Sequence, residues 1–93
     1  MGRPVGASED GEKQRENAEG VRAQVAEVFR LEYGRVVASV LRMIRDIDTA
    51  QEVVQEAFEQ ALSHWPGSGM PDRPGAWLLT TARRRALDRL RRS

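Results

Sequence analysis

DTAQEVVQEAFEQALSHW, residues 48–65, is the stretch that decides the fold. Its apolar residues recur at intervals of three and four, which is the period of one face of an α-helix. Asp48 is a favourable N-cap residue, and Gln51 stands three positions later, where it completes a capping box. The stretch therefore predicts an amphipathic helix that begins at about Asp48 and ends at about His64. Its predicted buried stripe comprises Val54, Phe58, Ala61 and Trp65.

Helical periodicity also precedes this stretch. Apolar residues recur with the helical period from Val21 until the sequence RDID, and Gly34 interrupts the run. Because glycine costs about 1 kcal/mol in a helix interior, Gly34 predicts either a kink or the meeting of two helices. The predicted stripe of this region comprises Val25, Val28, Phe29, Val36, Val40 and Ile44.

A loop and a further helix follow. Residues 66–75, PGSGMPDRPG, hold three prolines and three glycines, which predicts a loop. Pro74 suits the first turn of the next helix. Because no stretch alternates with a period of two, the sequence predicts an all-α bundle of three or four helices. The predicted buried stripe of the last helix comprises Leu79, Ala82, Ala86 and Leu90.

The composition narrows the class of protein. Residues 1–20 are poor in core-forming side chains and predict a disordered leader, so the folded domain is expected at 21–93. No apolar run approaches the roughly 20 residues of a membrane span, which predicts a cytoplasmic protein without membrane contact. With no cysteine and one histidine, His64, we expect no metal and no cofactor. No arrangement of nucleophile and base is recognisable, so we predict that the protein is not an enzyme.

Charge is segregated along the chain. Residues 46–60 carry five acids and no Lys or Arg, whereas residues 73–93 carry seven Arg and one Asp. The side chains of Glu52, Gln55, Glu56 and Glu59 share one helix face, and the like charges of Glu52 and Glu56 repel at a spacing of four. A solvated face is the simpler interpretation, but a basic partner explains this pattern better.

The last helix presents arginines to solvent. Guanidinium groups match phosphate oxygens, so this face predicts contacts to a nucleic-acid backbone. The alternative is a solvated helix whose last cations complement the helix dipole, although this explains Arg83, Arg84 and Arg85 poorly. Trp65 and Trp77 flank the loop; both are expected in the core, with base stacking as the alternative.

Two of these segments together resemble a known family. DTAQEVVQEAFEQAL, followed by a proline-rich loop and PGAWLLTTARRRALDRLRR, resembles conserved region 2 of extracytoplasmic-function (ECF) sigma factors, which are subunits of bacterial RNA polymerase. The resemblance covers about residues 25–92. It implies a domain that binds the clamp helices of the beta-prime subunit of core RNA polymerase and recognises and opens the minus-ten promoter element. The loop motif looks most like a subfamily that carries a C-terminal extension.

The resemblance also implies two sets of site residues. Residues expected to bind polymerase are Asp48, Glu52, Gln55, Glu56, Phe58 and Glu59. The loop 66–73 and the start of the following helix are expected to take one extruded base of the non-template strand. Residues expected to bind promoter DNA are Arg73, Trp77, Thr80, Thr81, Arg84, Arg85, Asp88 and Arg89. Replacement of Glu56 by Arg is expected to weaken polymerase binding without unfolding the domain.

The sequence departs from the family at one instructive position. Many relatives carry Asn where this chain has Arg84, so their base preference does not transfer. The family also has a helix-turn-helix domain beyond this region, so the chain is expected to be one domain of a longer protein. Two rival interpretations stay open. One is a helical module that reads duplex DNA, and the other is a bundle whose charged faces both bind protein, such as an anti-sigma factor.

Overall fold

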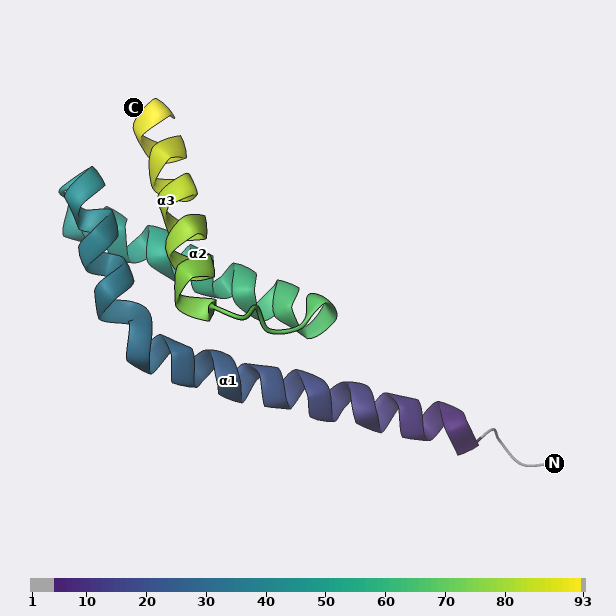
Figure 1. Ribbon diagram of the computed structural model, residues 1–93. Helices are drawn as coiled ribbons and strands as arrows, with labels where there is room; N and C mark the ends of the chain where they lie inside the picture. Colours follow the sequence, from purple (N-terminus) through teal and green to yellow (C-terminus); the bar gives the residue numbers. More distant parts are fainter. Residues whose placement is uncertain (1–4, 93) are drawn as a thin grey trace.

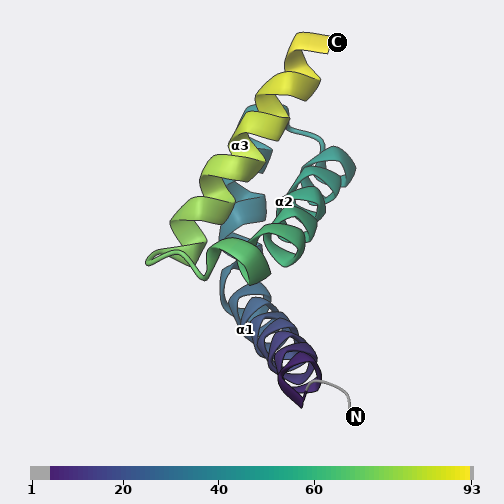
Figure 2. The same ribbon diagram turned by 90° about the vertical axis from the view of Figure 1, so that its right-hand side faces the viewer.

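Three α-helices make up the described part of the chain in the computed structural model. The structure describes the backbone of residues 5–92 and the side chains of Arg15 and of residues 19–92. The helices are α1 (Val5–Ile44), α2 (Ile47–Ser68) and α3 (Pro74–Arg92), and no strand occurs among the described residues. Each helix packs on the other two (Figures 1 and 2). The predicted all-α class is confirmed, with three helices.

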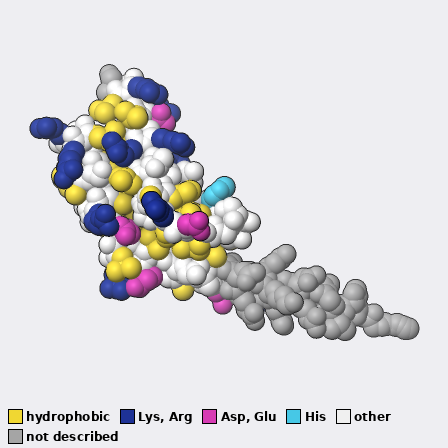
Figure 3. All heavy atoms as spheres, viewed as in Figure 1, with side chains coloured by type: hydrophobic (Ala, Val, Ile, Leu, Met, Phe, Trp, Pro, Cys, Tyr) yellow, Lys and Arg dark blue, Asp and Glu magenta, His cyan; other side chains and the backbone are white. Residues whose placement is uncertain are grey.

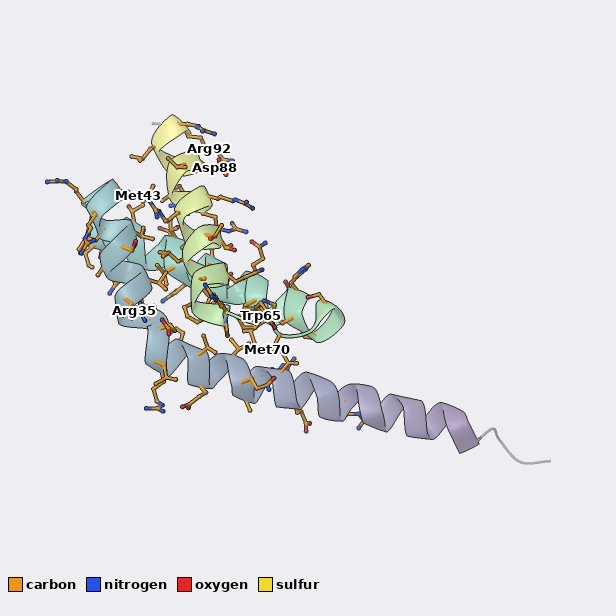
Figure 4. The ribbon with its side chains drawn as sticks, viewed as in Figure 1. Arg35, Met43, Trp65, Met70, Asp88 and Arg92 are labelled. Atoms are coloured by element: carbon orange, nitrogen blue, oxygen red, sulfur yellow. The ribbon has the colours of Figure 1, made fainter. Side chains whose placement is uncertain are left out.

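Helix α1 is long and bent. It runs without interruption from Val5 to Ile44, a span that contains no proline. Figure 4 shows Arg35 at the bend, next to Gly34, so of the two predicted arrangements the structure has the kink. The described part of the predicted leader, residues 5–20, is helical and extends away from the bundle in Figure 1. Residues 1–4 lie outside the described residues, and the domain division at residue 20 stays a prediction.

The connection between α1 and α2 is two residues long. Arg45 has a left-handed backbone (φ 64°), and its N–H donates to the carbonyl of Leu41 at 2.8 Å, as in a helix C-terminal cap. Asp46 is the N-cap of α2, where its carboxylate accepts a hydrogen bond from the Thr49 hydroxyl. The prediction that Asp48 is the N-cap was wrong, because the helix starts two residues earlier. Asp48 instead lies in the first turn, where its charge is favourable to the helix dipole.

Helix α2 also ends later than predicted. It passes through Pro66 and stops at Ser68, so the loop is residues 69–73 and not 66–73. Pro66 lies in the last turn of α2, where it has no N–H to donate to the carbonyl of Leu62. Gly69 ends the helix with φ 88°, a conformation that favours glycine, and its N–H donates to the carbonyl of Trp65 at 2.7 Å. Helix α3 begins at Pro74, as predicted.

The core lies where the three helices cross. The predicted α2 stripe is confirmed, because Val54, Phe58, Ala61 and Trp65 are all buried. Five alanines of α2 and α3 have no exposed surface, and their small side chains let the two helices approach closely. These are Ala50, Ala57, Ala61, Ala82 and Ala86. From the predicted α1 stripe Val25, Val36 and Val40 are buried, whereas Phe29 is 40% exposed.

The buried face of α3 differs from the prediction at two leucines. Ala82 and Ala86 are buried as expected, but the third buried residue is Leu78, with Leu79 only half-buried. Leu90 is 45% exposed. Its exposure has a simple cause, since the last turns of α3 extend beyond the ends of α1 and α2 (Figures 1 and 2). The buried face of α3 is therefore rotated relative to the predicted one.

Candidate functional site

An acidic strip lies on the outer surface of α2. We define it as Asp48, Glu52, Gln55 and Glu59, all of which are exposed. These residues follow one another at intervals of three and four, so the helix places them on the side away from the buried stripe. Within the described residues Glu59 has no ion pair. Four of the six residues expected to bind polymerase thus form one continuous solvent-facing surface.

The other two predicted polymerase-binding residues lie elsewhere. Phe58 is 4% exposed and packs edge-on against Phe29 of α1, with ring centroids 4.9 Å apart. The Phe58 ring lies in the core and has almost no exposed surface for a partner. The side chain of Glu56 is 30% exposed and points toward α3. Phe58 therefore belongs to the core in this structure, as its place in the buried stripe of α2 requires.

Two arginines of α3 bind the carboxylates of α2. Arg89 Nη2 donates to Glu56 Oε2 at 2.7 Å and to Glu52 Oε1 at 3.3 Å. Hydrogen bonding to Glu52 and the charge of Glu56 raise the pKa of Arg89 above its ordinary value. Arg85 Nη2 donates to Gln60 Oε1 at 2.9 Å, and its Nη1 lies 3.6 Å from Glu56 Oε1. We call this group the interhelical clasp: Glu52, Glu56, Gln60, Arg85 and Arg89.

The clasp corrects one inference from the sequence. On the sequence alone, repulsion between Glu52 and Glu56, with no cation on their own helix, favours an external basic partner. The structure supplies these cations from α3, so the repulsion is relieved within the chain. It also shows that Arg85 and Arg89, both expected to contact phosphate, already have anionic partners. The charge pattern of α2 and that of α3 are therefore parts of one arrangement.

The remaining predicted DNA-binding residues are more accessible. Arg73, Thr80, Arg84 and Asp88 are exposed, and Trp77 and Thr81 are half-buried. Neither Arg73 nor Arg84 has an ion pair within the described part of the chain. In Figure 3, Lys and Arg side chains gather over the part of the molecule formed by α3 and the end of α1, with few acids among them. Figure 4 places Asp88 and Arg92 on the last turns of α3.

An aromatic cluster lies where α2, the loop and α3 meet. Trp65 is 1% exposed, and Met70 of the loop packs against the core cluster to which Trp65 belongs (both labelled in Figure 4). The Trp77 ring packs edge-on against Trp65 at 5.1 Å and lies nearly parallel to His64 at 6.2 Å. Trp65 is a core residue, as expected. Trp77 is half-buried, so part of its side chain is accessible to a ligand next to the loop.

A basic groove between α1 and the start of α3 was not predicted. It has a volume of about 670 Å³, and its polar side chains are Glu32, Arg35, Ser39, Arg42 and Arg73. Arg35 and Arg42 are seven residues apart, a spacing that places them on one face of α1. The spacing of the two arginines can be read from the sequence. The groove could not be predicted from it, because the opposite wall is the start of α3. Arg73 belongs both to this groove and to the set of residues predicted to bind DNA.

Comparison with known proteins places the chain in a family. Residues 28–93 match the family described as Sigma-70 region 2. The chain belongs to this family. Sigma factors are non-enzymatic transcription initiation factors, so the prediction that the chain is not an enzyme is confirmed.

Individual relatives of this region 2 domain include named sigma factors. It is 41% identical over 61 residues to ECF RNA polymerase sigma factor SigK of Mycobacterium sp. (strain KMS), covering 61% of this chain and 30% of that protein. RNA polymerase sigma factor SigK of Mycobacterium sp. (strain MCS) matches equally. Uncharacterized protein R00370 of Rhizobium meliloti (strain 1021) is 40% identical over 58 residues, covering 62% of this chain and 14% of that protein.

The region 2 domain spans less than a third of the length of these curated relatives. No solved structure matches it. Among its described helices, none has the length and apolarity needed to cross a bilayer. Among the side chains that the structure describes, no group of three or more His, Cys, Asp or Glu residues is placed to hold a metal ion.

Proposed function

We propose that this domain is the promoter-recognition region of an ECF sigma factor, which docks on core RNA polymerase and holds the opened minus-ten element. The observation that carries the proposal is the separation of two exposed surfaces. The acidic strip of α2 is open to a basic partner, whereas the last residue of the loop 69–73 and the surface of α3 carry exposed arginines. Both surfaces belong to a chain of the Sigma-70 region 2 family. Similarity to SigK supports the ECF assignment.

The acidic strip is the proposed docking surface for the beta-prime clamp helices. Its side chains are exposed, and like charges concentrated on one face favour a partner of opposite charge. Phe58 positions the strip through its packing on Phe29 and makes no direct contact in this proposal. Glu56 contributes through the clasp, where it holds Arg85 and Arg89 against α2.

The clasp changes the choice of variant for testing this surface. Replacement of Glu56 by Arg would place a third cation beside Arg85 and Arg89, so a loss of binding could follow from repulsion between α2 and α3. Glu59→Arg is cleaner, because Glu59 is exposed and has no ion pair within the described residues. A charge reversal at a complementary surface is expected to weaken binding about tenfold.

A binding assay with the purified clamp-helix fragment tests the docking surface. Glu19→Arg is the matched control, since Glu19 is an exposed acid of α1 far along the chain from the strip. Far-UV circular dichroism should show the same helix content in both variants. Equal affinity of Glu59→Arg and the unaltered chain would show that polymerase does not dock on the strip.

The loop and the exposed face of α3 are the proposed DNA surface. The open part of the Trp77 ring offers a stacking platform for an unpaired base, and base stacking on an aromatic ring is worth about 1–3 kcal/mol. Arg73 and Arg84 flank it as exposed cations. Thr80 and Asp88 share the surface with them, and Thr81 lies at its edge. Because Arg84 is a cation, we expect it to contact a phosphate and not a base edge.

Fluorescence anisotropy with labelled oligonucleotides tests the DNA surface. Trp77→Leu keeps apolar volume for the core but removes the stacking ring, so single-strand affinity should fall about fivefold or more. The logarithm of the affinity should decline with the logarithm of salt concentration by about 0.7 per phosphate contacted. Preference for duplex over single strand would instead indicate major-groove reading. Absence of any DNA affinity would support the rival in which both faces bind protein, including an anti-sigma factor.

A further inference from the structure

We infer that the groove between α1 and the start of α3 is a second binding site for nucleic-acid phosphates, which makes α1 part of the DNA surface. The inference rests on the proposed function and extends it. In that function the DNA surface comprises the loop and α3 only. The groove adds Arg35, Ser39 and Arg42 of α1, for none of which the sequence predicts a partner.

The charge of the groove favours an anion. Its walls carry three arginines and one glutamate, which gives a net charge of +2. Arg42 and Arg73 have no ion pair within the described part of the chain. Arg35 lies 3.5 Å from Glu32, but its side chain is 81% exposed, so the pair is loose and open to exchange. Three cations can therefore turn toward an incoming phosphate.

The contrast with the clasp strengthens this assignment. Arg85 and Arg89 donate hydrogen bonds to Gln60, Glu52 and Glu56 at 2.7–3.3 Å, and a phosphate must compete with those partners. In the groove, Arg42 and Arg73 have no ion pair within the described residues, and Arg35 has only the exposed pair with Glu32. The groove arginines are therefore more available to a phosphate than Arg85 and Arg89.

Glu32 shows how the groove is built. A Cβ atom at Gly75 would lie 2.9–3.2 Å from the carboxyl group of Glu32, so this carboxylate rests against the first turn of α3. An anion is favourable there because of the free N–H groups and the helix dipole. The arrangement holds Glu32 at the end of the groove with its side chain 27% exposed, and it leaves the arginines as the accessible charges.

The geometry favours a polynucleotide as the occupant. Arg35 and Arg42 are separated by about 10 Å along α1, which is long enough for two or three successive phosphates. The groove also includes Arg73, which is the last residue of the loop in the proposed DNA surface. A strand held at the loop can therefore continue into the groove. An acidic protein segment is the main alternative, and the tests below separate the two.

The first test compares two double variants of α1. Arg35→Gln/Arg42→Gln removes both α1 cations of the groove, and Arg22→Gln/Arg30→Gln removes two exposed cations outside it. Net charge falls equally in both, so general electrostatic attraction is matched. With a single-stranded oligonucleotide in fluorescence anisotropy, the groove variant should lose about tenfold in affinity at low salt. Its salt slope should fall by about 1.4, for two lost contacts.

The control double variant should change affinity by less than about threefold and keep its salt slope. Equal losses of DNA affinity in the two double variants would show that the groove is not a phosphate-binding site. The proposed function would be unaffected by that result. If the unaltered chain binds no single strand at all, both the groove and the proposed DNA surface are wrong. Circular dichroism checks that the helices are intact in each variant.

A second test locates the strand directly. The chain has no cysteine, so a single introduced cysteine carries a photocrosslinker to one place only. Ser39→Cys puts the probe in the groove, and Ser63→Cys puts it on the exposed side of α2. The expected result is an oligonucleotide adduct with the Ser39→Cys variant and none with the Ser63→Cys variant. No DNA adduct with the groove probe, or a polymerase adduct in its place when core enzyme is added, would overturn the inference.

Discussion

Leu78 offers the sharpest test of how α3 sits on the bundle. The sequence alone favoured Leu79 and Leu90 as the buried leucines of this helix, but Leu78 is 0% exposed and Leu90 is 45% exposed. Adjacent residues of a helix are about 100° apart around its axis. The identity of the buried leucine therefore defines which face of α3 packs into the core of the bundle.

The expected cost of Leu78→Ala follows from complete burial. Truncation of a buried leucine costs about 2–5 kcal/mol, because apolar contact is lost and a cavity remains. A folded unit of this size is stabilised by about 4–10 kcal/mol in total. A loss near 3 kcal/mol should lower the melting temperature by about 12–24 °C. Leu90→Ala, the matched control, removes the same atoms from a half-exposed site and should cost less than about 1 kcal/mol.

Urea and thermal unfolding, followed by far-UV circular dichroism, measure both variants. The magnitude of the Leu78 effect identifies a core position, and the difference between the two leucines identifies the face. If Leu90→Ala is the more damaging change, α3 is rotated from its position in this structure, and the clasp does not form as described.

Two further predictions concern the connections between helices. Arg45→Gly should stabilise the chain by about 0.5–1 kcal/mol, because Arg45 has a left-handed backbone that glycine adopts without strain; Arg45→Ala, which keeps the Cβ atom, should bring no such gain in urea unfolding. Glu56→Gln should raise the affinity of the chain for single-stranded DNA about threefold or more, because it removes the carboxylate charge that Arg85 and Arg89 share, although Gln60 and Glu52 still accept hydrogen bonds from them. Glu59→Gln changes the net charge equally and should raise affinity less than about twofold in the same anisotropy assay. Equal gains would mean that the clasp does not restrain these arginines.

The sequence was sufficient for the buried face of α2 and insufficient for that of α3, for a physical reason. In α2 the large residues Val54, Phe58 and Trp65 fall on one stripe, and only one rotation of the helix buries them all. In α3 the paired Leu78 and Leu79 both precede Ala82 and Ala86 at helical spacings of three or four. The choice between them depends on which neighbours cover the helix, and that information lies in the other two helices.

Local signals were reliable only where a single residue determines the backbone. Pro74 predicted the start of α3 and Gly34 marked the place where α1 bends, but the N-cap of α2 was predicted at Asp48 and lies at Asp46. The structure selects Asp46, since α1 ends at Ile44 and its left-handed Arg45 leaves room for one residue before α2. The sequence predicted an acidic surface on α2 and a basic surface on α3. It could not predict the hydrogen bonds between them, because these depend on how α2 and α3 cross.

The clasp joins the two proposed binding events. Glu52 belongs both to the acidic strip and to the clasp, where it accepts a hydrogen bond from Arg89. In the proposed function, a basic partner on the strip would compete with Arg89 for this carboxylate, while Glu56 Oε2 continues to accept a hydrogen bond from Arg89 at 2.7 Å. By thermodynamic linkage, whatever factor docking adds to DNA affinity, DNA must add to docking affinity. If the competition for Glu52 couples the two proposed binding events, we expect docking on the strip to change the affinity for DNA, and DNA to change the affinity for docking by the same factor.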